Sequence, residues 1–336
     1  MMTYPISIIG AGSWGTTLAI LLSEKGHPVT LWVRREELLR TMEASRENKV
    51  YLPGFKIPES VTLTGSLKEA VAGQSLIVSA VPSHVTREVS QAYAPYLKPQ
   101  ATVISATKGL ETETLLPMSR VLAAMLPQVR GIAVLSGPSF AKEVCQKLPT
   151  AVVAASSRKE VAELVQNLFT TSYFRVYTNL DVIGVELAGA LKNVIALAAG
   201  ISDGLGFGTN SRAALITRGL AEVARLGIAM GAQPLTFAGL AGIGDLILTC
   251  TGELSRNRQV GLAIGRGQRL AEVIARMQMV AEGVKTTQAA VRLANQHQIE
   301  MPITQQVYAM LFEGKNPMDA VAELMGRTLK DEQAAS

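Results

Sequence analysis

The stretch from Pro5 to Val33, PISIIGAGSWGTTLAILLSEKGHPVTLWV, decides the fold. It begins as an apolar strand, passes through a glycine loop at residues 10–15, and continues as a helical pattern into a second apolar strand. Gly10 permits a tight turn, Gly12 leaves bare backbone open to a pyrophosphate, and Gly15 lets the helix pack against the strand. The amides at the helix start then face an anion. Glycines also mark ordinary turns, but the flanking strands and helix favour a dinucleotide site.

The residues after the second strand bear on which dinucleotide binds. An NAD-preferring site usually carries Asp or Glu there, where the carboxylate bonds the ribose hydroxyls. This chain has Arg34 and Arg35, which suit a 2′-phosphate and therefore NADPH/NADP. Glu36 and Glu37 follow at once and compete with that interpretation, so NADH/NAD stays open. The alternative for the two arginines is a solvated basic corner.

Composition limits the class of protein. The chain has 336 residues, 48% of them hydrophobic and 18% charged, which fits two folded domains. A net charge of +5 suits anionic small molecules, and no basic run with interleaved aromatics indicates nucleic acid. Neither a signal peptide nor a membrane span is expected, because Glu186, Lys192 and Asn193 interrupt the most apolar stretch. We therefore expect a cytoplasmic protein.

Two cysteines are the whole thiol content of the chain. Cys145 and Cys250 lie far apart and lack metal-ligand spacing, so we expect no metal. Their scarcity fits a reducing compartment. The sequence leaves a monomer and a homodimer open.

The first half of the chain alternates short apolar runs with helical stretches. The run LIVSAV at residues 76–81 is apolar on both faces, as parallel strands covered by helices are. The segments between such runs are long enough for crossover connections. We therefore expect an α/β, Rossmann-type doubly wound sheet domain over residues 1–184. Its strands are expected at residues 6–10, 29–33, 76–81, 102–106, 132–136, 151–155 and 174–177.

The pattern changes near Asp181, after which helical periodicity replaces the strand runs. Residues 185–336 are therefore expected to form an all-helical domain that carries the substrate and the catalytic group. Its helices are expected at residues 184–199, 211–230, 234–238, 256–265, 270–277, 286–296, 303–312 and 317–325.

Ligands of open α/β sheets bind beyond the carboxyl ends of the strands, which directs attention to the loops there. Lys108 follows one strand and would place a cation at the rim for an anionic substrate. A surface lysine in a turn is the alternative. His84 follows another strand, but a loop histidine after a proline is more often structural or exposed than catalytic.

Lys192 is the most informative residue of the second half. It lies in an otherwise small and apolar helix, where a partly buried lysine can exchange a proton near neutral pH. Glu186, Gly189 and Asn193 lie on or near the same face by helical spacing. The alternative is a lysine that extends its ammonium to water, or pairs with Glu186, without chemistry.

A second polar cluster lies between residues 245 and 257. Ser255, Arg256 and Asn257 at a helix start would make a phosphate cradle of backbone amides, a guanidinium and an amide donor. Taken alone, an N-cap serine with solvated arginines is the preferred explanation. Asp245 follows a glycine-rich run, and there it is either a site residue or a helix cap.

Taken together, these blocks identify a family. The chain resembles bacterial NAD(P)-dependent glycerol-3-phosphate dehydrogenase from end to end. The glycine loop alone is unspecific, whereas the Lys192-Asn193 block combined with Ser255-Arg256-Asn257 is specific. The other matching blocks are residues 81–84, 106–111, 136–143, 204–210, 242–249, 280–283 and 300–303.

The resemblance implies a role for each matching residue. Lys192 would be the general acid/base, and Asp245 would help to orient it and the substrate. Lys108 and Arg256 would each touch both substrate and cofactor. The remaining substrate contacts would be Gly137, Ser139, Ser255 and Asn257. The remaining cofactor contacts would be Gly10, Gly12, Ser13, Trp14, Gly15, Arg34, Arg35, Ala141, Val280 and Glu282.

The resemblance also implies the reaction. We expect reduction of dihydroxyacetone phosphate to sn-glycerol 3-phosphate by NADPH or NADH, for glycerophospholipid biosynthesis. The substrate would lie between the two domains, which would close to exclude water. One alternative is a two-domain reductase for another small carbonyl substrate, such as a β-hydroxy acid or ketopantoate. The other is an NADPH-binding sensor without turnover.

Overall fold

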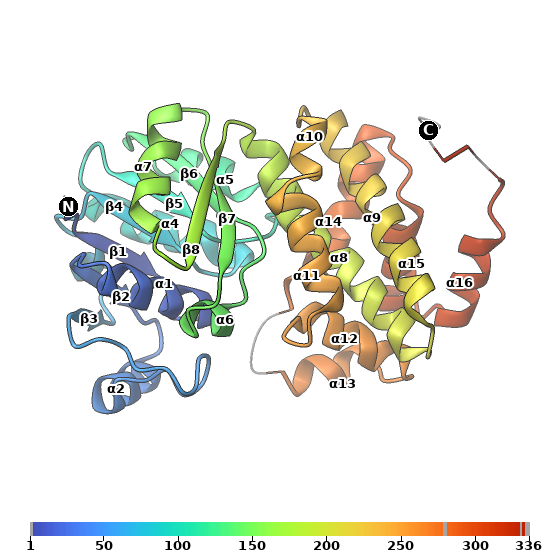
Figure 1. Cartoon of the computed structure of the whole chain (residues 1–336), viewed down its shortest axis with the longest axis horizontal. Coiled ribbons are helices and arrows are strands. Elements are labelled where there is room, and N and C mark those ends of the chain that lie inside the picture. Colours follow the sequence, from blue (N-terminus) through green and yellow to red (C-terminus); the bar gives the residue numbers. More distant parts are fainter. Residues whose placement is uncertain (1–2, 278–280, 330, 333–336) are drawn as a thin grey trace. The chain divides into compact units, whose positions relative to one another are not determined.

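The computed structural model describes residues 3–277, 281–329 and 331–332. Within the chain, two compact units are distinguished (Figure 1). The sheet unit comprises Met1–Glu111 and Leu116–Glu186. The helical unit comprises Leu187–Ser336 and the short segment Thr112–Leu115.

The sheet unit is built on eight strands in the order β3-β2-β1-β4-β5-β6-β7-β8. All neighbouring pairs are parallel except β6 and β7. Alternate residues of the central strands face the two sides of the sheet, so Ile104 packs in one apolar cluster and Val103 in the other. The strands are β1 Ile6–Ile9, β2 Val29–Trp32, β3 Val61–Thr64, β4 Leu76–Ser79, β5 Thr102–Ser105, β6 Gly131–Ser136, β7 Thr150–Ala155 and β8 Phe174–Asn179.

The seven strands expected from the sequence are confirmed, and β3 was missed. β3 is a four-residue edge strand, VTLT, that pairs only with β2 and exposes Thr62. The expectation that every strand pair is joined by a parallel crossover was wrong for β6 and β7. Only the five-residue helix α6 (Ala141–Cys145) lies between them, and the chain returns antiparallel to β6.

Helices cover the sheet through apolar faces, and the buried positions of α7 (Lys159–Phe169) repeat at helical spacing at Val161, Val165 and Leu168. Two short helices follow the carboxyl ends of strands, η1 (Ser83–Val85) after β4 and α6 after β6. The other helices of this unit are α1 Ser13–Glu24, α2 Glu36–Ser45, α3 Leu67–Val71, α4 Thr86–Tyr93, η2 Ala94–Tyr96 and α5 Met118–Met125.

The helical unit is organised around α8 (Val182–Gly204), which starts in the sheet unit and continues as the most buried helix of the second unit. The eight expected helices are confirmed. Two further elements were missed: a π-helical turn, η3 (Leu240–Gly244), and α11 (Asp245–Thr251). The remaining helices are α9 Thr209–Ala229, α10 Pro234–Phe237, α12 Arg256–Gly265, α13 Leu270–Ala275, α14 Glu282–His297, α15 Pro302–Phe312 and α16 Pro317–Met325.

Helices α8 and α12 cross at backbone contact through two glycine pairs. A Cβ on Gly200 would lie 2.1 Å from the carbonyl oxygen of Arg258, and one on Gly204 would lie 2.5 Å from that of Leu262. In return, Gly261 and Gly265 approach the backbone of α8. Only glycine permits this separation. The crossing therefore fixes the start of α12 against the helix that carries Lys192.

Two segments have the length and hydropathy of a membrane span, α8 and residues 234–251. In α8 the apolar window is 89% buried within the protein, as in the core helix of a globular domain. The second segment is broken by η3 and is 44% buried.

Candidate functional site

The glycine loop has the geometry that its sequence predicts. Gly10 has φ +116°, and a Cβ there would lie 2.8 Å from the carbonyl oxygen of Ala80. A Cβ on Gly15 would lie 1.9 Å from the carbonyl oxygen of Gly10, so α1 packs directly on the loop. Gly12 is the N-cap of α1 and has open space around its Cα. The loop therefore combines a tight turn, close packing and an accessible helix N-terminus.

The two residues after Gly12 differ in their surroundings. Ser13 is partly exposed, and its carbonyl accepts a hydrogen bond from the Thr17 hydroxyl. The ring of Trp14 packs at 6.4 Å, centroid to centroid, from that of Phe174. Thr17 also donates to the carbonyl of Ala141, at 3.3 Å, which brings α6 against α1. Ala141 is thus held beside the helix that follows the glycine loop.

The arginines after β2 are exposed, and Arg35 is the N-cap of α2. The Arg35 guanidinium donates to the Tyr51 hydroxyl at 2.9 Å and lies over the ring at 5.4 Å. Glu36 pairs with Arg40, one turn along α2. The Glu36 carboxylate, which was expected to compete with the NADPH interpretation of the arginines, therefore already has a cation within its own helix.

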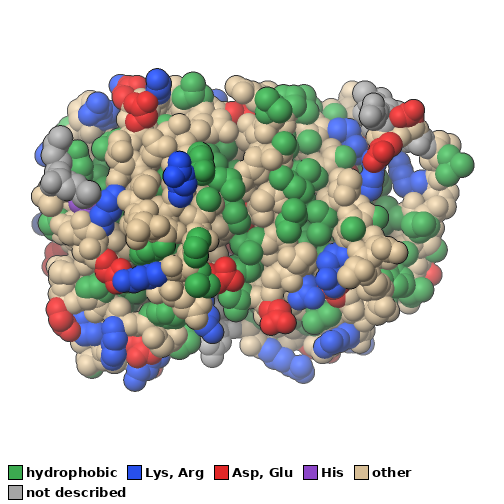
Figure 2. All heavy atoms as spheres, in the orientation of Figure 1, with side chains coloured by type: hydrophobic (Ala, Val, Ile, Leu, Met, Phe, Trp, Pro, Cys, Tyr) green, Lys and Arg blue, Asp and Glu red, His purple; other side chains and the backbone are tan. Residues whose placement is uncertain are grey.

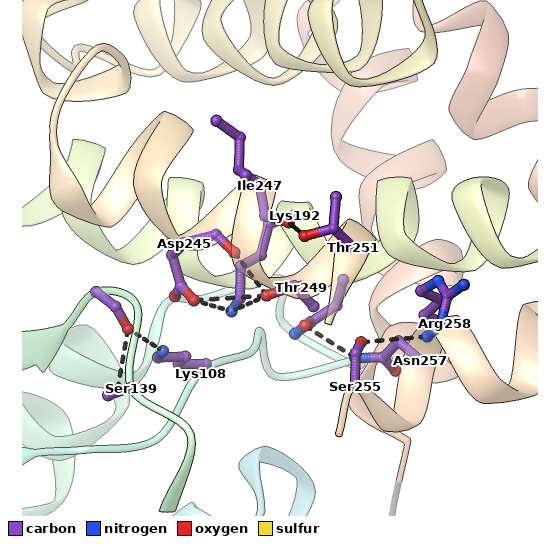
Figure 3. A network of polar contacts seen from close by, with 12 residues as sticks. Lys108, Ser139, Lys192, Asp245, Ile247, Thr249, Thr251, Ser255, Asn257 and Arg258 are labelled. Carbon is purple, nitrogen blue, oxygen red and sulfur yellow. Dashed lines mark hydrogen bonds and ion pairs between the residues drawn. The ribbon is translucent and has the colours of Figure 1, made fainter. Parts of the chain in front are cut away.

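Lys108 and Ser139 converge on one carbonyl oxygen in the sheet unit (Figure 3). The Lys108 ammonium donates to the carbonyl of Gly137 at 2.9 Å, and the Ser139 hydroxyl donates to it at 3.0 Å. Gly137 has φ +131°, and a Cβ there would lie 2.9 Å from the backbone of Val152. The loops after β5 and β6 are therefore joined at their expected carboxyl ends. His84, after β4, is exposed.

Lys192 forms a buried ion pair in the helical unit. Its ammonium contacts a carboxylate oxygen of Asp245 and donates to the Thr249 hydroxyl at 2.6 Å (Figure 3). The side chains of Lys192 and Asp245 are only 8% and 1% exposed. Asp245 is the first residue of α11, and Thr249 lies one turn further on the same face. The ammonium is therefore removed from water and paired with a buried carboxylate.

The alternative partner of Lys192, Glu186, is engaged elsewhere. Its carboxylate accepts hydrogen bonds from the Ser119 amide, at 2.8 Å, and from the Ser119 hydroxyl. Burial raises the pKa of Glu186 to about 7, against the lowering effect of these hydrogen bonds. This geometry does not favour the alternative in which Lys192 pairs with Glu186, because the Glu186 carboxylate caps the start of α5.

The start of α12 carries the serine–arginine–asparagine block. Ser255 is the N-cap, and its hydroxyl accepts from the Arg258 amide at 3.3 Å. The Asn257 amide group donates to Asn193 at 2.9 Å, and its oxygen accepts from the Gly283 amide at 2.9 Å. Asn257 therefore links α12 to α8 and α14, and the N-cap explanation of Ser255 is confirmed.

The arginines of this block are not solvated. Burial lowers the pKa of the Arg256 guanidinium, and the nearby Glu282 carboxylate raises it. Arg258 forms an ion pair with Asp203 at 2.7 Å, and Asp203 also pairs with Arg212. The prediction of solvated arginines was therefore wrong. Val280, predicted as a cofactor contact, lies outside the described residues.

Sequence reasoning missed Thr249 and Asn48, and it gave no partner for Asn193. Thr249 stands four residues after Asp245, a spacing that would have been visible had α11 been predicted. The sequence near Asn193 offers no evident partner for its side chain, because only the crossing of α8 and α12 brings it to Asn257. Asn48 is fully buried beside the glycine loop, in a segment whose sequence has no helical or strand period.

Comparison with known proteins decides the family. The model of the NAD-dependent glycerol-3-phosphate dehydrogenase N-terminus matches residues 5–162, and that of its C-terminus matches residues 181–322. The chain belongs to the NAD-dependent glycerol-3-phosphate dehydrogenase family. A glycerol-3-phosphate dehydrogenase [NAD(P)+] of Geobacter metallireducens is 60% identical over 330 residues, 98% of each chain. One from Geobacter sp. (strain M21) is 58% identical over 333 residues, 98% of this chain and 99% of that protein.

Solved structures agree with this family assignment. The crystal structure of a glycerol-3-phosphate dehydrogenase from Coxiella burnetii is 43% identical, with a TM-score of 0.93 over 97% of this chain and 99% of that one. A ketopantoate reductase from Ralstonia eutropha has a TM-score of 0.61 at 19% identity, covering 92% of this chain and 97% of that one, which shows a shared fold alone. Among the described residues of this family member, no group of three His, Cys, Asp or Glu residues is placed to hold a metal.

Proposed function

We propose that the chain reduces dihydroxyacetone phosphate to sn-glycerol 3-phosphate with NADPH or NADH, in a reversible reaction. The buried Lys192–Asp245 ion pair carries this proposal, because it supplies a proton donor held in place within an apolar helix pair. The family assignment and the relatives named glycerol-3-phosphate dehydrogenase [NAD(P)+] support the same reaction.

The residues of the glycine loop fit a dinucleotide. The open space at Gly12 and the helix start behind it suit a pyrophosphate, and the glycine loop with Ser13 and Trp14 would hold it. Arg34 and Arg35 would meet a 2′-phosphate, as bidentate donors do. Lys108, Ala141, Arg256, Val280 and Glu282 are proposed as further contacts. When bound, the reduced nicotinamide supplies the hydride.

The protein's own part in the chemistry is to supply a proton and to stabilise charge. As the ketone accepts a hydride, negative charge develops on its oxygen, and the Lys192 ammonium donates a proton there. Asp245 and Thr249 accept hydrogen bonds from that ammonium, which holds it in a fixed position. In the reverse direction, the neutral amine accepts the proton of the alcohol.

The start of α12 is proposed to bind the phosphate. Arg256 offers a planar pair of donors, and Ser255 and Asn257 lie at the same helix N-terminus, which favours an anion. Asn257 has two amide hydrogens, of which the bond to Asn193 uses one. In the sheet unit, Lys108, Gly137 and Ser139 are proposed as further substrate contacts, with Lys108 adding positive charge.

The product and the composition suggest where the enzyme acts. We infer that it is a cytoplasmic enzyme that supplies sn-glycerol 3-phosphate to glycerophospholipid biosynthesis. We also infer that its ligands are small molecules rather than nucleic acid, since the net charge is only +5.

We propose a homodimer on the basis of one stretch of the helical unit that is almost free of charged residues. Between Leu226 and Gly252, Asp245 is the only charged residue and is buried, while Ile228, Leu235 and Ile247 are 45%, 84% and 47% exposed. Hydrophobic side chains gather over the helical unit on the face seen in Figure 2. In a chain of net positive charge, two copies can meet through such a stretch with little repulsion. Light scattering of Leu235→Lys should report a smaller species than the native chain does.

The decisive experiment is a reductase assay with dihydroxyacetone phosphate that follows the absorbance of the reduced nicotinamide, with NADPH and NADH in parallel. Oxidation of either cofactor with this substrate, and none with unphosphorylated ketones, is expected. Turnover of ketopantoate or other carbonyl acids instead would favour a different reductase. Cofactor binding without turnover of any ketone would indicate a sensor.

A further inference from the structure

The segment from Arg46 to Ile57 forms a closed loop beside the glycine loop. The Ile57 amide donates to the carbonyl of Arg46 at 2.8 Å, and Glu47 and Lys56 form an isolated bridge at the base. Leu52 and Ile57 are 3% and 2% exposed and anchor the loop in the core of the sheet unit. A compact loop that is tied at its base and packed by its own side chains holds its inner residues in fixed positions.

Asn48 is the inner residue of this loop and is 0% exposed. Its amide nitrogen donates to the carbonyl of Ala11 and to the hydroxyl of Thr16, both at 2.9 Å. Its oxygen accepts from the Tyr51 amide at 3.1 Å. Both amide hydrogens are therefore used on the glycine loop and the first turn of α1.

The Ala11 carbonyl and the Thr16 hydroxyl lie in the chain on either side of Gly12, the glycine with open space around its Cα. Ala11 stands between Gly10 and Gly12, and Thr16 is in the first turn of α1. A donor that holds both of them fixes the orientation of the backbone between them, including the amides at the helix start. Without the amide, two buried acceptors would lose their donor in a part of the core that water does not reach.

We propose that Asn48 is a positioning residue for the dinucleotide, which acts by holding the glycine loop in its binding conformation. The inference rests on the proposed function, since it assumes that this loop binds the pyrophosphate. The pyrophosphate is common to NADPH and NADH, so loss of Asn48 weakens both cofactors in parallel. Arg35 differs, because it lies after β2, where the ribose is recognised.

The test compares Asn48→Ala with Leu52→Ala, a buried apolar change in the same loop. Calorimetric titration with NADPH and with NADH should show both dissociation constants raised about tenfold in N48A, with their ratio unchanged. At saturating cofactor, kcat should stay within about twofold of the native value, since tight binding of the cofactor is all that is lost. L52A should lower the melting temperature and leave both dissociation constants unchanged.

Unchanged dissociation constants in N48A, with a lowered melting temperature like that of L52A, would overturn the inference and leave Asn48 a structural residue. A change in the NADPH:NADH ratio would also overturn it. Should N48A fail to fold, Asn48→Ser carries the same comparison, because serine is too short to reach both acceptors. A native chain that binds neither cofactor would instead refute the proposed function.

Discussion

The two units of this chain present their functional groups in different ways. In the sheet unit, glycines at positions 10, 12 and 137 expose or bend the backbone itself. In the helical unit, the groups are buried side chains, Lys192 and Asp245, held by ion pairing between helices. Backbone amides suit a cofactor shared by many reductases, whereas side chains set which reaction follows. Changes at Lys192 should therefore alter turnover, and changes in the glycine loop should alter cofactor binding.

The largest effect is expected at Lys192. Lys192→Ala should lower kcat at least about a hundredfold, the usual scale for a lost acid or base, and leave the affinity for NADPH unchanged. Lys192→Met, which keeps most of the side-chain volume, should lose as much turnover with a smaller loss of stability. The measurements are steady-state kinetics and cofactor titration. Near-normal kcat in both variants would remove Lys192 from the mechanism.

A smaller effect is expected at Arg256. Arg256→Ala should raise the KM for dihydroxyacetone phosphate about tenfold, more than it changes kcat, because a bidentate phosphate contact is lost. Arg256→Lys is the matched control, since it keeps the charge but not the planar fork, and it should recover only part of the affinity. If R256A left this KM unchanged, the phosphate assignment at α12 would be wrong.

A change at Arg35, after β2 of the sheet unit, should alter cofactor binding. Arg35→Ala should raise the KM for NADPH about fivefold and leave that for NADH nearly unchanged, because only NADPH carries the 2′-phosphate. Arg40→Ala is the control, since that arginine is exposed and pairs with Glu36 on the same helix. Equal losses for both cofactors would show that Arg35 does not discriminate between them.

The smallest effect concerns pH and a carboxylate outside the site. Glu222 accepts hydrogen bonds from the Ile303 and Thr304 amides at the start of α15, and burial raises its pKa to about 7. Because the folded-state pKa lies above the unfolded value of about 4.5, this carboxyl's stabilising contribution is complete below pH ~4.5 and is lost as pH rises through ~7.

Glu222→Gln should therefore flatten the decline of unfolding free energy between those pH values by on the order of 1 kcal/mol per pH unit. Urea titrations of both proteins at several pH values measure the slope. Glu186, also raised to about 7, remains in both and accounts for part of the remaining slope. Identical slopes would show that Glu222 titrates no differently in the folded and unfolded states.

The elements that sequence predicted best are those with long, uniform patterns. The parallel strands were visible as runs that are apolar on both faces, and α9 and α15 were visible by their helical period. β3 escaped because a short edge strand needs no such run. α11 escaped because the glycines before it imply a loop, whereas they form a π-helical turn that leads directly into the helix.

The same limit applies to the candidate site. Lys192, Asp245 and Arg256 were singled out because a charged residue in an apolar stretch or at a helix start can be recognised from the sequence alone. The pairing of Lys192 with Asp245 followed from the family resemblance and not from the residue pattern, since Glu186 is nearer in sequence while Asp245 is reached only when α11 packs near α8. Asn48 was missed for a related reason, because its segment has no periodicity and its function lies in two backbone contacts.

The glycine crossing of α8 and α12 has a consequence for how this enzyme can change. No side chain stands between the two helices at Gly200 and Gly261, so their separation is set by main-chain atoms alone. Mutation can therefore exchange the groups that the helices carry, but it has no graded means of moving the proposed proton donor, Lys192, relative to the helix start proposed to bind the phosphate. Substrates of a different length would have to be accommodated elsewhere, by residues that approach from outside this pair of helices.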